Sequence, residues 1–259
     1  MSTDRMTPEQ QAVTDRVMAE ESAKRRHLVV HLSGAHAYGF PSRDSDLDLK
    51  ALHVVPTREL LGFRPEEKTF NRLEFVDGVE VDYTSNELQR GLLNLLSGDG
   101  NMLERVTSRS PVVAHPWLEE LVALVPGVLS RRYHRHYRGF AGNQRRRFLE
   151  AEAPSAKKLL YVLRTALTGT HLLLEQECQP DLIELHERYG FPEVPELVEL
   201  KQVAEKGSLS DRWARRSEPL MQRAFDRLEQ ALERSPLPEE PGGRNELEGW
   251  LIDVRRRGL

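Results

Sequence analysis

The sequence predicts an α+β protein in which a small mixed or antiparallel sheet domain is followed by an all-helical C-terminal domain. Four short apolar or β-branched runs lie between residues 27 and 84, and turn residues separate them. After Pro116, almost every segment repeats its apolar residues with the period of a helix. A chain of 259 residues is long enough to build a core in both parts. We expect a sheet domain at residues 1–115, a helical domain at 116–235, and a linker with a short docking helix at 236–259.

The N-terminal helix is predicted by its capping residues. Thr7 can cap the helix, Pro8 suits the first helical position, and Gln10 stands where a capping-box partner belongs. We expect this helix to end near Arg26, where the first strand-like run begins.

Four strands are predicted from residue type and turn signals. The first covers residues 27–32 and ends at a Ser-Gly turn, and the second covers residues 47–55 and ends at a proline. The third and fourth, at residues 69–76 and 79–84, flank an Asp-Gly pair. Because Asp-Gly between strand-like runs is a strong hairpin signal, we expect these two strands to pair with each other.

Helical periodicity covers most of the remaining chain. From Asn86 the leucines repeat at helical spacing until Gly98, and apolar residues of segment 156–168 fall on one helical stripe. Residues 235–243 are rich in proline and glycine and read as a linker. The segment 247–254 that follows is amphipathic, so we expect it to form a short helix that docks on another element.

Composition excludes several classes of protein. The formal net charge of -4 does not predict general nucleic-acid binding. Cys178 is the single cysteine, which excludes an intramolecular disulfide and is typical of a reducing compartment. The charged N-terminus has no apolar signal core, and no run of about 18 apolar residues occurs. We therefore expect a soluble, cytoplasmic protein.

A turn and two carboxylates form the pattern most indicative of chemistry. The strand that ends at Leu32 meets Ser33-Gly34, and such a turn exposes backbone N–H groups that can hold a phosphate. A polar loop then leads to Asp46 and Asp48 at the start of the next strand. Alternate strand residues point to the same face, about 6.5–7 Å apart. The two aspartates are therefore placed to share metal ions.

A third carboxylate, Asp82, is available on the second arm of the predicted hairpin. Glu80 shares its predicted face and is a competing candidate, whereas Asp44 is interpreted as a loop or capping residue. If this strand lies beside that of Asp48, then Asp46, Asp48 and Asp82 form one site. Magnesium prefers hard oxygen ligands. Two ions about 3.5–4 Å apart can activate an acceptor hydroxyl and neutralise a leaving pyrophosphate.

The runs Gly34-Ala35, Tyr38-Gly39 and Asp44-Ser45-Asp46-Leu47-Asp48 resemble the signature of the DNA polymerase β-type nucleotidyltransferase superfamily. They are most similar to its bacterial branch of stand-alone predicted nucleotidyltransferases, and the resemblance spans roughly residues 28–174. It implies an enzyme that moves an NMP from an NTP such as ATP to an acceptor hydroxyl and releases pyrophosphate. It also implies two Mg²⁺ ions, with Mn²⁺ as a substitute, held by the catalytic residues Asp46, Asp48 and Asp82. One position departs from the signature, because Ala35 stands where the superfamily has a serine.

The resemblance also implies which residues contact the triphosphate. Superfamily members commonly use a lysine of the helical domain, and both Lys157 and Lys158 are candidates for that role. Lys157 shares a helical face with Tyr161 and Arg164, opposite the leucine stripe. The candidate nucleotide-binding residues are Ser33, Gly34, Ala35, His36, Lys157, Lys158, Tyr161 and Arg164.

The acceptor is predicted from a basic stretch. Residues 131–164 contain ten lysines and arginines and two acidic residues, with Tyr133, Tyr137 and Phe140 interleaved. A solvated face with snorkelling arginines and a phosphate-binding wall both fit this pattern. The second interpretation favours RNA, at a 3′ end in repair or processing. The alternatives are nucleotidylation of a protein, as in antitoxin-type enzymes, and a catalytically inactive nucleotide- or RNA-binding module, which Ala35 favours.

Overall fold

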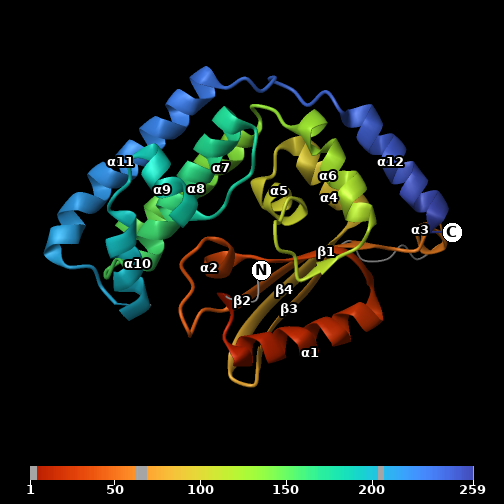
Figure 1. Ribbon diagram of the computed structural model, residues 1–259, viewed down its shortest axis with the longest axis horizontal. Helices are drawn as coiled ribbons and strands as arrows, with labels where there is room; N and C mark the ends of the chain where they lie inside the picture. Colours follow the sequence, from red (N-terminus) through yellow and green to blue (C-terminus); the bar gives the residue numbers. More distant parts are fainter. Residues whose placement is uncertain (1–4, 62, 64–68, 204–206, 259) are drawn as a thin grey trace. The chain divides into compact units, whose positions relative to one another are not determined.

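The computed structural model describes residues 5–61, 63, 69–203 and 207–258. The chain folds into two compact units (Figure 1). We call the first the sheet unit, and it comprises residues 1–34, 45–129 and 241–259. The second, the helical unit, comprises residues 35–44 and 130–240. The predicted α+β class, with a small mixed sheet and a helical C-terminal region, is confirmed.

The sheet unit is built on a five-stranded mixed sheet with the strand order β3-β4-β2-β1-β5. Strands β2 and β4 run parallel, whereas the other neighbouring strands are antiparallel. The four predicted strands form, and the predicted hairpin turns at Asp77 and Gly78, whose φ angles are 49° and 83°. The short strand β5 was not predicted. The strands are β1 (Arg26–Leu32), β2 (Leu47–Val54), β3 (Thr69–Val76), β4 (Val79–Glu87) and β5 (Val113–Ala114).

Helix α1 (Pro8–Lys24) covers one face of the sheet (Figure 1). The predicted capping box begins it: Thr7 accepts from the backbone N–H of Gln10, and the Gln10 side chain accepts from the backbone N–H of Thr7. Val13 and Val17 of the helix share a buried cluster with apolar side chains of β2 and β4. This packing fixes which face of each strand is buried, and therefore which face carries the polar residues.

Helices α4 and α5 lie on the side of the sheet opposite α1 (Figure 1). Gly98 ends α4 with a φ of 84°, as the sequence predicts. Arg105 of α5 donates to the carbonyl oxygen of Ala51 at 2.7 Å and to Oδ1 of Asn86 at 2.6 Å, which joins the helix to β2 and β4. The helices of this unit other than α1 and α12 are α3 (Thr57–Leu60), α4 (Leu88–Ser97), α5 (Gly100–Val106) and α6 (Trp117–Val128).

The C-terminal helix α12 (Arg244–Arg257) docks on α6, within the sheet unit. The backbone N–H of Gly243 donates to the carbonyl oxygen of Gly127 at 2.6 Å, and Trp250 Nε1 donates to Glu120 at 2.9 Å. The expected boundaries at residues 115/116 and 235/236 therefore do not coincide with the compact units, because α6 and α12 pack with the sheet. Periodicity identifies a helix and its apolar face, but not the element that will cover that face.

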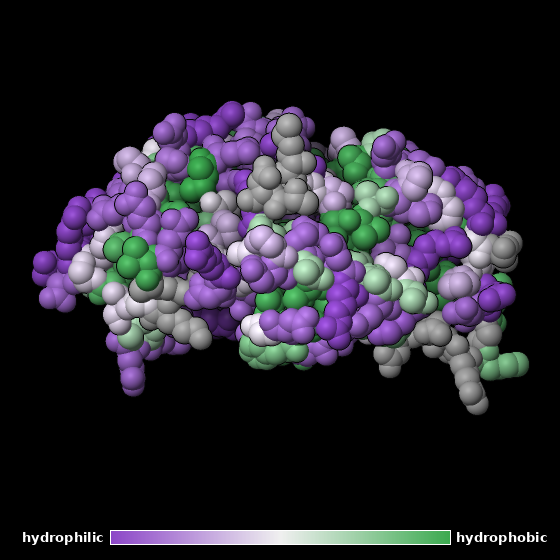
Figure 2. Space-filling view, turned by 60° about the horizontal axis from the view of Figure 1, so that its bottom comes forward, coloured by the Kyte–Doolittle hydropathy of each residue, from purple (hydrophilic) through white to green (hydrophobic). Residues whose placement is uncertain are grey.

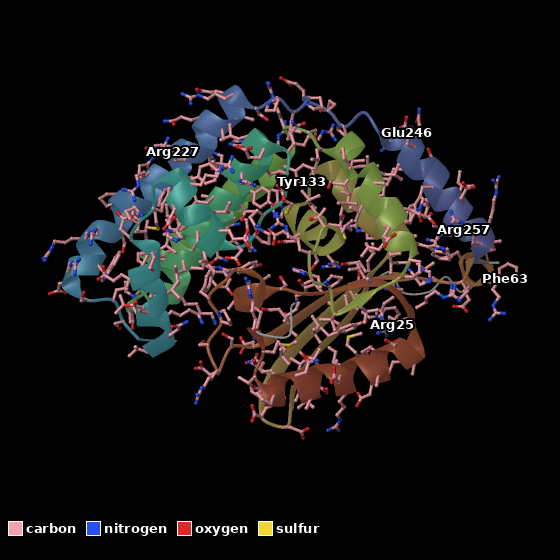
Figure 3. The ribbon with its side chains drawn as sticks, viewed as in Figure 1. Arg25, Phe63, Tyr133, Arg227, Glu246 and Arg257 are labelled. Atoms are coloured by element: carbon pink, nitrogen blue, oxygen red, sulfur yellow. The ribbon has the colours of Figure 1, made fainter. Side chains whose placement is uncertain are left out.

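The helical unit contains α7 (Tyr133–Leu149), α8 (Ala156–Glu175), α9 (Leu182–Tyr189), α10 (Val194–Val203) and α11 (Asp211–Arg234). Ser155 caps α8, and this helix is central because α7, α9, α10 and α11 all contact it. Figure 3 labels Tyr133 at the start of α7, where its side chain is fully buried. Cys178 is also buried, as expected for a structural cysteine, with its Sγ 3.9 Å from the hydroxyl of Tyr137.

Residues 35–44, which follow β1, belong to the helical unit. A short helix, α2 (Gly34–Ala37), follows the turn. The carbonyl oxygen of Tyr38 accepts from the backbone N–H of Leu182 at 3.0 Å, and Ser42 Oγ accepts from Nζ of the buried Lys201 at 2.8 Å. The boundary between the units therefore falls inside the predicted turn motif, between Gly34 and Ala35.

The face of the molecule in Figure 2 is mostly hydrophilic, with separate hydrophobic patches. Among the described residues, no helix has the length and apolar composition needed to cross a bilayer.

Candidate active site

Asp48 and Asp82 lie side by side in the sheet. Strands β2 and β4 are parallel neighbours, and their register pairs Asp48 with Asp82. Both side chains project from the face opposite α1, because Leu47 and Leu49 of β2 are buried on the α1 side. The two side chains are 29% and 45% exposed. Asp46, also half-buried, directly precedes β2 in the sheet unit, and its charge acts on the carboxyl of Asp48.

Lys50 stands between the two carboxylates and was not predicted from the sequence. Its Nζ is 2.7 Å from Oδ1 of Asp82 and 3.6 Å from Oδ1 of Asp48, and it also donates to the carbonyl oxygen of Asp82 at 3.2 Å. The signal for it was available, since Lys50 is the next residue of β2 on the face of Asp48. The ammonium group of Lys50 is thus a cation that both aspartates share.

The pKa of Asp48 is set by its burial and by the charged side chains around it. Burial raises the pKa of its carboxyl above the usual value, and the negative charges of Asp82 and Asp46 raise it further, whereas Lys50 lowers it. Negative charge is therefore concentrated at the start of β2, and positive charge placed there is stabilised.

The turn after β1 contacts this group through Gly34. Its φ is +65°, a conformation that favours glycine. A Cβ at this position would lie 2.1 Å from Oδ2 of Asp48, so only glycine permits this close approach. The backbone N–H of Ser33 donates to the carbonyl oxygen of Asp48 at 2.8 Å. The turn and the carboxylate are therefore held together.

The aspartate group suits a hard divalent cation by its donor chemistry. In the part of the chain that the structure describes, no three His, Cys, Asp or Glu side chains form a preassembled metal site. Asp48 and Asp82 nonetheless present carboxylate oxygens to one shared cation, the Lys50 ammonium. Oxygen ligands of this kind are those that Mg²⁺ and Mn²⁺ prefer.

The candidate nucleotide-binding residues of α8 pack on residues 38–40. The rings of Tyr38 and Tyr161 lie 5.6 Å apart and those of Phe40 and Tyr161 lie 5.8 Å apart. The guanidinium carbon of Arg164 is 3.4 Å from the centre of the Tyr38 ring, and Arg164 is only 1% exposed. Arg164 was predicted on the face of α8 opposite the leucine stripe, and it is buried because the aromatic segment covers it.

The other predicted nucleotide-binding residues of the helical unit differ in exposure. Ala35 and His36 are buried, and Ala35 belongs to the apolar cluster of that unit. The side chain at position 35 thus has apolar neighbours, an environment that suits the methyl group of alanine. Lys157 is half-buried and Lys158 is exposed. These residues lie in the helical unit, whereas Ser33, Gly34 and the three aspartates lie in the sheet unit.

Several arginines of the basic stretch are neutralised within the helical unit. Arg138 donates to Glu229 at 2.6 Å, Arg145 lies 3.4 Å from Glu218, and Arg132 pairs with Glu240. These pairs agree with the interpretation of a solvated helix face. Arg135 and Arg147 are exposed on the same helix, and among the described residues neither has a carboxylate partner.

Comparison with known proteins identifies the family. Residues 6–253 match the family described as "RNA repair pathway DNA polymerase beta family" (RlaP). A solved structure of a nucleotidyltransferase-like protein from Exiguobacterium sibiricum 255-15 is 12% identical, and the match covers 94% of this chain and 79% of that chain with a TM-score of 0.33. The search of curated proteins found no match. Because the family match covers almost the whole chain, this protein belongs to the RNA repair pathway DNA polymerase beta family and is a nucleotidyltransferase.

Proposed function

We propose that this chain transfers an NMP from an NTP to the 3′ hydroxyl of an RNA, using Asp46, Asp48 and Asp82. The pairing of Asp48 with Asp82 across two parallel strands carries this proposal, because it places two carboxylates on one face beside the Gly34 turn. That arrangement combines a cation site with a turn suited to phosphate, which nucleotidyl transfer requires.

Asp46, Asp48 and Asp82 would hold divalent cations, with Mg²⁺ as the expected ion and Mn²⁺ as a substitute. When bound, such ions stabilise the negative charge of the phosphates and lower the pKa of a coordinated hydroxyl. Lys50 balances part of the acidic charge in their absence. Asp82 is the more exposed of the two strand carboxylates, which supports it as the acceptor of the proton of the attacking hydroxyl.

RNA is favoured as the acceptor by the family and by the charge that remains on α7. The family description refers to RNA repair. Arg135 and Arg147 are exposed without a carboxylate partner among the described residues, so they are available to a phosphate backbone. Ser33 and Gly34 of the turn are the proposed triphosphate contacts in the sheet unit, and Lys157 and Lys158 are the candidates in the helical unit. The two buried candidates at positions 35 and 36 would contribute through their backbone.

A catalytically inactive nucleotide- or RNA-binding module is the second candidate. The observation that favours it is Ala35, whose methyl group lies in an apolar cluster and cannot donate to a triphosphate. The complete aspartate group stands against it. Activity of the wild-type protein decides between the two.

The test is transfer of label from α-labelled NTPs to short RNAs with a free 3′ hydroxyl, in Mg²⁺ and in Mn²⁺. We expect Asp48→Asn and Asp82→Asn to lower transfer by about 100-fold or more, since each replaces a negatively charged ligand of the proposed cations by a neutral amide. Glu80→Gln is the comparison variant, because Glu80 projects from the same face of β4 and competes with Asp82 for the role; retained transfer in Glu80→Gln assigns that role to Asp82. Absence of transfer from the wild type, or persistence of transfer in Asp48→Asn, would contradict the proposal.

The RNA acceptor is tested by two neighbouring arginines of α7. Arg135→Ala removes an exposed cation that has no carboxylate partner among the described residues, whereas Arg138→Ala removes one that pairs with Glu229. We expect the first change, and not the second, to raise the KM for RNA by about threefold at low salt. If the acceptor is a protein, both variants should transfer the NMP to that protein as fast as the wild type does.

A further inference from the structure

A basic cavity lies in the sheet unit, where β1 begins and β2 ends. Its volume is about 580 Å³, within the range of small-molecule sites. We call it the basic pocket and define it by its lining residues. These are Lys24, Arg25, Arg26, His53, Val54, Val55, Pro56, Arg58, Glu59, Phe70, Arg257 and Gly258.

The charges around the basic pocket are strongly unbalanced. Among the described residues, five lysines and arginines line it and Glu59 contributes one carboxylate. Three of these cations are already engaged: Lys24 and Arg25 pair with Glu21, and Arg257 pairs with Glu120. Across the described part of the chain, Arg26 and Arg58 have no carboxylate partner. Within the described residues, the pocket therefore keeps positive charge that no carboxylate neutralises.

The pocket also contains a buried polar atom without a partner. His53 is 1% exposed, and its Nδ1 is 2.8 Å from Oγ of Ser85. Among the described residues, Nε2 of His53 has no hydrogen-bond partner. Buried polar atoms in native proteins are nearly always paired, so this atom indicates a group that the pocket receives. Burial and the charge of Arg25 lower the pKa of His53 to about 4, which agrees with a positive environment.

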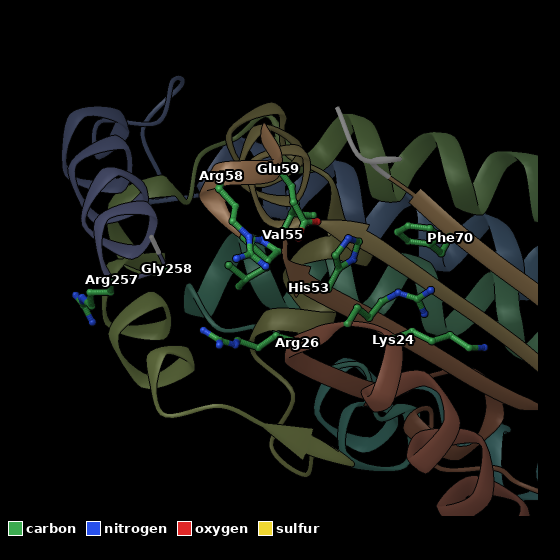
Figure 4. Close-up of a pocket in the computed structure, with 12 residues that line it drawn as sticks. Lys24, Arg26, His53, Val55, Arg58, Glu59, Phe70, Arg257 and Gly258 are labelled. Carbon is green, nitrogen blue, oxygen red and sulfur yellow. The ribbon is translucent and has the colours of Figure 1, made fainter. Parts of the chain in front are cut away.

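The side chains differ in how they meet the cavity (Figure 4). Arg58 and His53 extend into the middle of the labelled group, whereas Lys24 and Arg257 end at its rim and point outward. Arg25 lies over the ring of Phe70, with its guanidinium carbon 4.2 Å from the ring centre. Figure 3 shows that Arg25 and Arg257 come from different parts of the unit, the end of α1 and the end of α12. Elements distant in the sequence thus converge on one basic surface.

We propose that the basic pocket binds a phosphate ester of about nucleotide size, at a site separate from the aspartate group. Guanidinium groups match the geometry of phosphate oxygens, and a dianion balances Arg26 and Arg58 together. A single inorganic ion would fill a small part of 580 Å³, so the volume fits a phosphate that carries a larger group. His53 is five residues from Asp48 on β2 and points to the opposite face, about 17 Å along the strand. The pocket therefore does not belong to the transfer site.

The test is a binding titration of the full-length protein in EDTA and low salt. The probes are AMP, a 5′-phosphorylated RNA trinucleotide and the same trinucleotide with a 5′ hydroxyl. We expect the phosphorylated probes to bind, and Arg58→Glu and Arg26→Gln each to weaken that binding by about tenfold or more. Equal affinity for AMP and the phosphorylated trinucleotide identifies a free nucleotide as the ligand. Tighter binding of the trinucleotide identifies an RNA end.

The controls separate this site from the transfer site and from misfolding. Arg16→Glu changes an exposed arginine of α1 that lies outside the pocket, and binding should be unchanged. Asp48→Asn should also leave binding unchanged, so the outcome does not depend on transfer activity. A shift of the His53 ring resonances with the phosphorylated probes is the second expected readout. Absence of wild-type binding, or equal binding by wild type, Arg58→Glu and Arg26→Gln, would overturn the proposal.

Discussion

The two ends of strand β2 carry opposite charge on opposite faces. Asp46 and Asp48 begin the strand, and their charge is partly balanced by Lys50 of the same face. His53 near the other end faces a cavity with five cationic side chains. At the acidic end the protein supplies its own counter-ion, whereas at the basic end two arginines lack one among the described residues. The difference shows that one strand can present groups of opposite charge at its two ends, because alternation places neighbouring residues on separate faces.

The largest expected effect tests the close contact between Gly34 and the carboxylate of Asp48 at the acidic end. Gly34→Ala places a Cβ 2.1 Å from Oδ2 of Asp48, so the carboxylate or the turn must move. Displacement of a reacting group by about 1 Å costs roughly 100-fold in rate, and we expect a loss of transfer of about that size.

Gly78→Ala is the matched control for the backbone effect. Its φ of +83° resembles that of Gly34, but no atom lies within 4 Å of the added Cβ. Both variants should lose about 1 kcal/mol of stability from the positive φ. If both also transfer at the same rate, the contact between Gly34 and Asp48 has no role in the site.

The second effect concerns the stability of the basic end in acid. The pKa of His53 is lowered from 6.5 to about 4, so the folded state favours the neutral ring. Its contribution to the free energy of unfolding is fully present above pH 6.5 and is lost as the pH falls toward 4. We expect about 2 kcal/mol to be lost over that range, measured by urea unfolding.

His53→Gln removes this titration while keeping a polar side chain. The variant should therefore lose less stability than the wild type between pH 7 and pH 4.5, whatever its stability at pH 7. The neighbouring His27, whose pKa is also about 4, still titrates in both proteins. Parallel pH profiles for wild type and variant would show that His53 is not held neutral by its surroundings.

These two sites also differ in how far the sequence predicts them. Asp-Gly between strand-like runs placed the hairpin turn correctly, and the two-residue period placed Asp48 and Asp82 on polar faces. The pairing of β2 with β4 joins segments far apart in the sequence. The sequence could therefore predict the shared site only if these two strands were neighbours. The same period places Lys50 on the face of Asp48, but residue type alone does not indicate a lysine between two carboxylates. The strand and turn motifs thus predict the strands and the faces at the acidic end, but neither the register nor Lys50.

The basic pocket had no sequence signal. Arg26, Arg58 and Arg257 are ordinary surface residues in the sequence, and only the docking of α12 brings the last of them near the end of β2. The packing of Arg164 on Tyr38 was likewise unpredictable, because it depends on residues 126 positions apart in the chain. Helical periodicity shows which face is apolar, but cations can be buried when an aromatic ring covers them.

The third effect tests the counter-ion at the acidic end. Lys50→Met removes the ammonium that lies 2.7 Å from Asp82 and must otherwise be displaced by a divalent cation. We expect Mn²⁺ to bind about tenfold more tightly to this variant, measured by electron paramagnetic resonance, because the competing positive charge is gone. Lys158→Met, at an exposed lysine, should leave Mn²⁺ binding unchanged. Weaker binding to Lys50→Met would mean that the lysine organises the carboxylates rather than competing for them.

The smallest effect concerns the open surface beside the acidic end. Leu73 of β3 pairs with Asp82 in the antiparallel register, so its side chain projects from the carboxylate face, where it is 71% exposed. An apolar side chain next to the proposed proton acceptor is suited to contact the ribose or base of the acceptor. We therefore expect Leu73→Ser to raise the KM for RNA by about threefold and to leave kcat unchanged, since lost apolar contact of this size is worth under 1 kcal/mol. Ile252→Ser, at a half-exposed residue of α12, controls for a general loss of surface hydrophobicity. A fall in kcat without a change in KM would mean that Leu73 positions Asp82 and does not contact the RNA.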